Sequence, residues 1–116
     1  MTKAGIEFPE VIDLVSHDPM KEKWELTIVE SGVWDGSTGR LQKLQQKLNN
    51  YLKFALDGEM QRTYPESAGK PVTVRLDLYQ RPDQRTLDFI LRARGEMERD
   101  GVELVLDIDI ADRVRH

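Results

Sequence analysis

The feature that most constrains the fold is that the segments expected to form strands are apolar on one side only. Within residues 72–79 and 102–110, every second side chain is apolar, and most of the side chains between them are polar. The apolar positions are Val72, Val74, Leu76, Leu78, Val102, Leu104, Leu106, Ile108 and Ile110. Because successive side chains of a strand point to opposite faces, a sheet of such strands has one apolar face. Helices are therefore expected to cover that face alone.

Two further strands are expected near the start of the chain, at residues 11–16 and 23–30, which are rich in β-branched or alternating apolar residues. The polar turn between them is short, so the two strands should form an antiparallel hairpin. The side chains that they place on the apolar face are expected to be Ile12, Leu14, Trp24, Leu26 and Ile28.

A long amphipathic helix is expected after Gly39, because leucines recur there at spacings of three and four residues. Its buried stripe should contain Leu41, Leu44, Leu48, Leu52, Ala55 and Leu56, with polar residues such as Lys47 on the other side. Gly58 either ends this helix or lies within it. We expect the helix to continue to about Tyr64, where Pro65 stops it.

A second helix is expected to begin after Asp83, whose side chain is a good N-cap, and to end near Arg99. Its inward positions should be Leu87, Ile90, Leu91 and Met97. Six arginines and no lysine lie in residues 75–99, among five acidic residues. Many of these charges should pair locally, as Asp88 does with Arg92 four residues later, which favours a solvated helix face over contact with RNA.

The order of these elements is ββαβαβ, which predicts an α/β (α+β) fold, a two-layer sandwich with a four-stranded mixed sheet and both helices on one face. The last two strands each follow a helix, so they should be joined by right-handed parallel crossovers. The strand order is then 1-2-3-4, or 2-1-3-4 if the first strand lies inside. We expect an irregular lead-in over residues 1–10, a single domain over 11–110 and a polar tail over 111–116.

The composition excludes several classes of protein. The 116 residues include no cysteine, so disulfides, thiolate nucleophiles and cysteine metal sites are absent. The net charge of −4 argues against a general nucleic-acid binder, which needs a basic surface. The chain shows neither a signal-peptide core nor an apolar run near the ~20 residues of a membrane span. We expect a cytoplasmic protein that contacts no membrane and needs no cofactor.

The second, third and fourth strands should run in the same direction, so their carboxyl ends share one edge of the sheet. Ligands of open α/β sheets usually bind outside this edge, and both helix N-termini open there. The loop over residues 31–40 is therefore a candidate site for a small anion or a nucleotide-type ligand. Its candidate residues are Trp34, Ser37, Thr38, Arg40 and Arg81. The alternative is structural: Asp35, Ser37 or Thr38 caps the helix, and Trp34 packs beneath the loop.

Acidic residues on the polar face of the sheet raise the remote alternative of an enzyme. Asp13, Asp77, Asp107 and Asp109 are expected to share that face, where paired carboxylates do acid–base chemistry or hold a divalent cation. A flat exposed sheet carries polar residues in any case, and the two histidines, His17 and His116, suggest no catalytic set. We therefore expect a solvated face with neither a catalytic residue nor a metal ligand.

Apolar residues on the same outward face favour self-association instead. They are expected to be Val15, Val29, Tyr79 and Val105. The last strand is an edge strand in either strand order, and a free edge beside a half-apolar face often becomes an oligomer contact. The leading hypothesis is thus a non-catalytic binding module whose partner is most simply a second copy of itself, in a homodimer.

Several segments are shared with a known family. They include Trp34-Asp35-Gly36, the helix segment Leu48-Asn49-Asn50-Tyr51-Leu52-Lys53-Phe54, and Tyr64-Pro65-Glu66. Through them, residues 11–110 resemble a family of small uncharacterised bacterial proteins that is known only as a domain of unknown function. The resemblance implies a bacterial source and carries over no functional residue.

Overall fold

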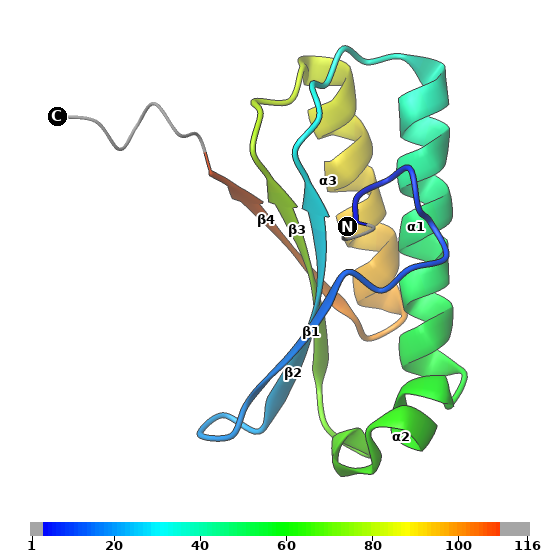
Figure 1. Ribbon diagram of the computed structural model, residues 1–116, viewed down its shortest axis with the longest axis vertical. Coiled ribbons are helices and arrows are strands. Elements are labelled where there is room, and N and C mark those ends of the chain that lie inside the picture. The colour runs from blue at the N-terminus through cyan, green and yellow to red at the C-terminus, as the bar shows by residue number, and fades with distance from the viewer. Residues whose placement is uncertain (1–3, 110–116) are drawn as a thin grey trace, which may run out of the picture.

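The computed structural model describes residues 4–109 and shows a four-stranded sheet with its helices on one side (Figure 1). The helices α1 and α3 stand side by side against the sheet, and the short helix α2 lies beyond the end of α1. The elements are β1 (Leu14–Asp18), β2 (Lys23–Glu30), α1 (Thr38–Leu56), α2 (Glu59–Thr63), a 3-10 turn (Pro65–Ser67), β3 (Val72–Leu78), α3 (Gln84–Arg99) and β4 (Glu103–Ile108). The predicted two-layer α+β sandwich is confirmed.

The order of strands in the sheet is β1-β2-β3-β4, which decides between the two orders that the sequence left open. The strand β1 is antiparallel to β2, whereas β2, β3 and β4 are parallel to one another. The carboxyl ends of these three strands therefore share one edge, as expected. Among the described residues, β1 and β4 are the two edge strands of the sheet.

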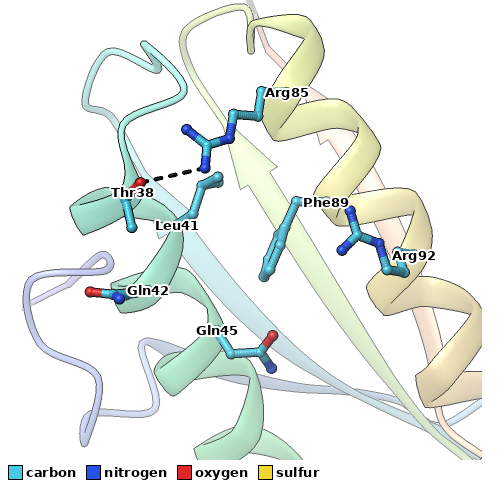
Figure 2. A pocket seen from close by; sticks show the side chains of 7 residues that line it. All are labelled: Thr38, Leu41, Gln42, Gln45, Arg85, Phe89 and Arg92. Carbon is cyan, nitrogen blue, oxygen red and sulfur yellow. Dashed lines mark hydrogen bonds between the residues drawn. The ribbon is translucent and has the colours of Figure 1, made fainter.

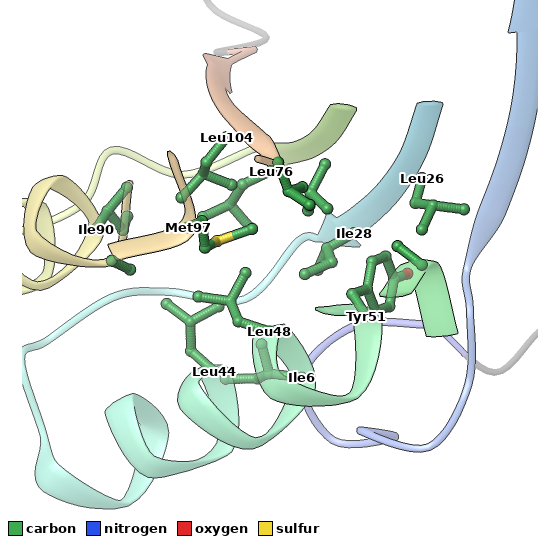
Figure 3. Close-up of a cluster of buried hydrophobic side chains, with 14 of the residues drawn as sticks. Ile6, Leu26, Ile28, Leu44, Leu48, Tyr51, Leu76, Ile90, Met97 and Leu104 are labelled. Atoms are coloured by element: carbon green, nitrogen blue, oxygen red, sulfur yellow. The ribbon is translucent and has the colours of Figure 1, made fainter. Parts of the chain in front are cut away.

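The core lies between the sheet and the helices, and it is built by the expected alternation (Figure 3). Leu26, Leu76 and Leu104 come from three neighbouring strands and point to the same face, where they are buried. The helices contribute buried side chains that face these strands, namely Leu44, Leu48, Tyr51, Ile90, Ala93 and Met97. Removal of this apolar surface from water is the main source of stability for the fold.

The side chains of β1 alternate in the opposite sense to the one predicted. Val15 pairs with Leu26 and packs against the core, whereas Leu14 pairs with Thr27 and is 51% exposed. Residues directly opposite each other in a sheet share a face, so the pairing with β2 decides which side of β1 is buried. The expectation that Leu14 faces the core, and that Val15 faces outward, is therefore wrong.

The helix expected to run to about Tyr64 is divided in two at Gly58. The backbone of Gly58 has a φ of +90°, in the left-handed region that favours glycine and that no helix interior contains. The first helix, α1, ends at Leu56, and Leu56 itself is half exposed. The shorter α2 then turns away and buries Met60 against the core.

The buried face of α3 is also rotated from the predicted one. Ile90 and Met97 are buried as expected, but Leu91 is 53% exposed. The other buried positions of α3 are Thr86, which precedes Ile90, and Ala93, which lies between Ile90 and Met97. The cap at Asp83 is confirmed, because its carboxylate accepts hydrogen bonds from the Thr86 backbone N–H and hydroxyl.

Replacing Leu48 by Ala should lower the free energy of unfolding by about 2–5 kcal/mol, because it removes a buried side chain from the centre of the core. The matched change Leu91→Ala should cost less than about 1 kcal/mol, since that side chain lies mostly in solvent. Urea unfolding followed by circular dichroism measures both losses. Similar losses at the two positions would contradict the assigned faces of α1 and α3.

Candidate functional site

The loop between β2 and α1 lies at the carboxyl edge of the sheet and already satisfies much of its own hydrogen bonding. Ser37 is the N-cap of α1, but its side chain makes no capping bond. The carboxylate of Asp35 accepts a 2.9 Å hydrogen bond from the Ser37 backbone N–H, and this bond holds the pKa of Asp35 below its usual value. Asp35 thus occupies a backbone N–H group that a bound anion would otherwise use.

Arg40 lies in the first turn of α1, at the end of this loop, and has three partners, one of which is the Glu7 carboxylate at 3.9 Å. Its guanidinium stacks over the buried ring of Trp34, 4.7 Å from the ring centroid, and donates a 3.0 Å hydrogen bond to Glu30. Glu30 is itself buried, so the ion pair leaves Arg40 little free charge for a ligand. Arg81 is exposed and forms no ion pair among the described residues. The structure therefore brings Trp34 and Arg40 together but gives Arg81 no contact with them.

Glu30 also holds the described segment before β1 in place. Its second carboxylate oxygen accepts a 2.7 Å hydrogen bond from the backbone N–H of Ile6, whose side chain is fully buried. The oxygen that binds Arg40 also accepts from the Gly32 N–H. A Cβ atom at Gly5 or Gly32 would lie 2.6 Å from these carboxylate oxygens, so a larger residue at either position would displace the Glu30 side chain. The φ of +91° at Gly5 also favours glycine there. The described segment before β1 is irregular up to residue 13, so the first strand begins later than the expected residue 11, and Ile6 packs into the core.

A buried ion pair lies next to this segment and corrects two expectations. The ammonium group of Lys47 donates to the carboxylate of Asp13 at 2.7 Å and to the carbonyl oxygens of Gly5 and Phe8. Both charged side chains are almost fully buried. The expectations that Lys47 faces solvent and that Asp13 lies on the open face of the sheet are both wrong. The polar groups face inward because each of them finds a partner there.

Tyr51 extends this polar network toward β2. Its hydroxyl donates to the carbonyl oxygen of Thr27 and accepts from the backbone N–H of Asp13, both at 2.8 Å. Burial raises the pKa of the Tyr51 hydroxyl far above its usual value, so it stays protonated. The network links the first segment, β2 and α1, and its groups are occupied by protein partners. The network therefore has a structural role, because it holds the segment before β1 against α1 and β2.

A surface cavity of about 300 Å³ opens between the N-terminal halves of α1 and α3 (Figure 2). We call it the α1–α3 groove, and it is lined by Thr38, Leu41, Gln42, Gln45, Arg85, Phe89 and Arg92. Of the residues expected to bind a ligand, only Thr38 belongs to it, and its hydroxyl lies 3.4 Å from the guanidinium of Arg85. The groove contains two guanidinium groups and an aromatic ring, and none of its lining residues is acidic.

The uncovered face of the sheet carries three of the four carboxylates that the sequence places there, Asp77, Asp107 and Asp109. Asp77 and Asp107 lie opposite each other on β3 and β4, and Arg75 forms an ion pair with Asp107. Burial raises the pKa of the Asp77 carboxyl, and the nearby acidic groups add to this effect. No group of three or more residues suited to holding a metal ion occurs within residues 4–109. The four carboxylates predicted to cluster are reduced to three, because Asp13 is buried elsewhere.

The outer side of β4 carries a second cavity, of about 350 Å³. We call it the β4 groove, and it is lined by Glu103, Leu104, Val105 and Leu106 of the strand and by Arg94 and Glu98 of α3. Of the four residues predicted for self-association, Val105 belongs to this groove, Val29 lies on the inner strand β2, and Tyr79 directly follows the inner strand β3. Arg94 and Glu98 carry no sequence signal beyond opposite charges one helical turn apart.

Within residues 4–109, the fold and these surfaces define a class of protein, a small two-layer α+β domain with one sheet face that no helix covers and a parallel edge strand. The chain belongs to a family of unknown function, DUF6572, whose sequence model matches residues 4–110. This membership confirms the resemblance seen in the sequence. No curated protein and no solved structure matches the chain. Within residues 4–109, no helix is both long and apolar enough to cross a membrane.

Replacing Lys47 by Met should lower the free energy of unfolding by about 3–5 kcal/mol, because it leaves the buried Asp13 carboxylate without its cation. The matched control is Lys43→Met on the same helix, which breaks an exposed pair with Glu7 and should cost at most about 1 kcal/mol. Chemical denaturation measures both variants. A loss for Lys47→Met as small as that for Lys43→Met would contradict the role of the buried pair.

The variant Asp77→Asn should be more stable than the wild type at about pH 7, and this gain should shrink toward about pH 3. A carboxyl whose pKa is raised in the folded state opposes folding by an amount that grows as the pH rises above its unfolded-state pKa and is complete above its folded-state pKa. Below the ordinary pKa of 3.8 the carboxyl is protonated in both states, and this penalty disappears. Thermal unfolding of both proteins across this range measures the difference. A gain that is constant with pH would refute the assignment.

Proposed function

We propose that this chain is a non-catalytic binding module that self-associates by pairing the β4 strands of two copies. The observation that carries the proposal is the β4 groove, which runs along the unpaired side of an edge strand. In the resulting homodimer, the two sheets form one continuous sheet, with the β4 strands antiparallel about a two-fold axis. Addition of a strand to a free edge is a common mode of protein recognition.

The backbone of β4 supports this pairing. The N–H of Asp109 donates to the carbonyl oxygen of Leu78, so the backbone groups of Asp109 point toward β3. Every second residue before Asp109 on β4 points the same way, and the residues between them point away from β3. In a parallel strand, both backbone groups of a residue point to the same side. The backbone groups of Leu104, Leu106 and Ile108 therefore point away from β3, where the described residues place no further strand. These groups offer a regular set of donors and acceptors to a partner strand.

The charges beside β4 favour a second copy of this chain as the partner. Arg94 and Glu98 are exposed, lie one turn apart on α3 and form no ion pair among residues 4–109. A two-fold axis through β4 makes the two α3 helices antiparallel on either side of the contact. Arg94 of one copy then faces Glu98 of the other, and the second pair follows by symmetry. The surface is thus complementary to itself in charge.

The open face of the sheet is compatible with the same arrangement. An axis near Val105 brings the two Val105 side chains together and places Glu103 near Asp107 of the other copy. Each of these acids already has a cation on its own sheet, since Lys23 pairs with Glu103 and Arg75 pairs with Asp107. Their mutual repulsion is therefore reduced. Val15 lies on the helix-covered face, so this surface leaves it out.

Charge reversal tests the proposal. Arg94→Glu and Glu98→Arg should each weaken dimerisation about tenfold or more at low salt, because each places like charges across the two-fold axis. The double variant Arg94→Glu with Glu98→Arg should restore most of the affinity, since it recreates the pairs in reverse. Sedimentation velocity over a range of protein concentrations measures the dissociation constants.

Arg99→Glu serves as the matched control, because it changes the charge of the same helix outside the β4 groove. It should leave the dissociation constant unchanged, whereas Val105→Lys should give monomers by placing charge at the centre of the contact. A wild-type protein that stays monomeric at about 1 mM would overturn the proposal. A double variant that dimerises no better than the single variants would overturn the two-fold pairing of Arg94 with Glu98.

The proposal includes a bacterial cytoplasm as the setting of this protein. Its support is the absence of cysteine from all 116 residues, which suits a reducing compartment, and the resemblance to a bacterial family. Fractionation of cells that express a tagged copy tests the location. Recovery in the periplasm or the membrane fraction would contradict it.

A further inference from the structure

We infer that the α1–α3 groove binds a phosphate monoester that carries a flat ring. The groove and the β4 groove are lined by different residues, so this inference goes beyond the proposed self-association. It rests on three properties of the α1–α3 groove, which are its unpaired positive charge, an aromatic ring between the two cations, and amide groups on the facing helix (Figure 2).

The first property is positive charge without an acidic partner. Arg85 and Arg92 are seven residues apart on α3, which places them two turns apart on the same side of the helix. Arg85 donates only to neutral oxygens, the Gly36 carbonyl at 2.7 Å and the Thr38 hydroxyl at 3.4 Å. A guanidinium that keeps its charge and has free donors is well suited to a phosphate oxygen.

Arg92 has fewer hydrogen-bond partners among residues 4–109 than Arg85 has. Its expected partner, Asp88, instead accepts a 2.8 Å hydrogen bond from the side chain of Gln84, and Arg92 forms no ion pair among residues 4–109. Glu96 lies four residues after Arg92 on the helix, and it lines a small adjoining cavity of about 60 Å³ with Arg92. It forms no ion pair with Arg92, so the cation remains available on the groove side.

The second property is a ring face. Phe89 lies between Arg85 and Arg92 along α3, and its side chain projects toward α1 (Figure 2). It is partly buried against the core, which fixes its position, while it still lines the groove together with Leu41. A flat ring stacked on Phe89 gains contacts that inorganic phosphate cannot make. Its charged group then lies within reach of a guanidinium on either side.

The third property is a pair of amides on α1. Gln42 and Gln45 line the groove opposite α3, and Gln45 donates to Asn49 at 3.0 Å, which leaves its carbonyl oxygen for a donor on a ligand. Such groups fix the orientation of a ring through its polar edge. The groove volume of about 300 Å³ lies at the small end of ligand sites, which suits a single ring system with one phosphate.

The test is a titration of the ¹⁵N-labelled protein followed by NMR, with phenyl phosphate, adenosine monophosphate and inorganic phosphate as separate probes. The two ring-bearing probes should cause saturable shifts at Gln45 and over residues 85–92, with dissociation constants about tenfold or more below that of inorganic phosphate. Stronger binding of one ring-bearing probe identifies the ring that the groove prefers.

Variants separate the two parts of the site. Arg92→Gln should weaken binding of the ring-bearing probes about tenfold. Phe89→Leu keeps apolar volume against the core and should reduce their affinity to that of inorganic phosphate. Arg99→Gln removes the same charge from the same helix outside the groove and should change nothing.

Three results would overturn the inference. The first is the absence of saturable shifts with the ring-bearing probes at about 10 mM. The second is equal weakening by Arg92→Gln and Arg99→Gln, which would show only general charge attraction. The third is equal affinity for inorganic phosphate and the ring-bearing probes, which would show that Phe89 contributes no ring contact.

Discussion

The one-sided apolar pattern of the strands is the constraint on which the rest of the structure depends. Because Leu26, Leu76 and Leu104 point to the same face, α1 and α3 must both lie there, and the other face offers no continuous apolar surface to a further layer. Two parallel crossovers in one direction then leave β4 at the edge of the sheet. Within residues 4–109, the uncovered sheet face and the edge position of β4 are thus consequences of the same pattern that builds the core.

The parts of the fold that were predictable from sequence are those set by short-range patterns. Alternation within β3 and β4 identifies the buried face without knowledge of the partner strands, and the Asp83 cap depends on a partner only three residues away. The sequence could not predict which side chains of β1 face the core, because Leu14 and Val15 are both apolar. Only the register with β2 places Val15 on the buried face. Gly58 was ambiguous because glycine is tolerated in a helix and also favoured at its end.

The candidate sites show the same limit more strongly, because they depend on contacts between distant parts of the chain. Lys47 looks solvated among polar neighbours on α1, and its buried partner Asp13 lies 34 residues earlier. This pair joins the segment before β1 to α1, because Lys47 also donates to the carbonyl oxygens of Gly5 and Phe8. Arg85, Phe89 and Arg92 share a side of α3 by their spacing, but only the packing of α3 beside α1 makes that side a groove.

Hydrogen exchange of the β4 backbone tests the central claim, the pairing of two β4 edges, most directly. The N–H groups of Leu104, Leu106 and Ile108 point away from β3, whereas those of Val105 and Asp107 point toward it. At protein concentrations above the dissociation constant, the three outward N–H groups should exchange slowly, and dilution should release them while the two inward groups stay protected. Equal, fast exchange of the outward groups at all concentrations would contradict the account.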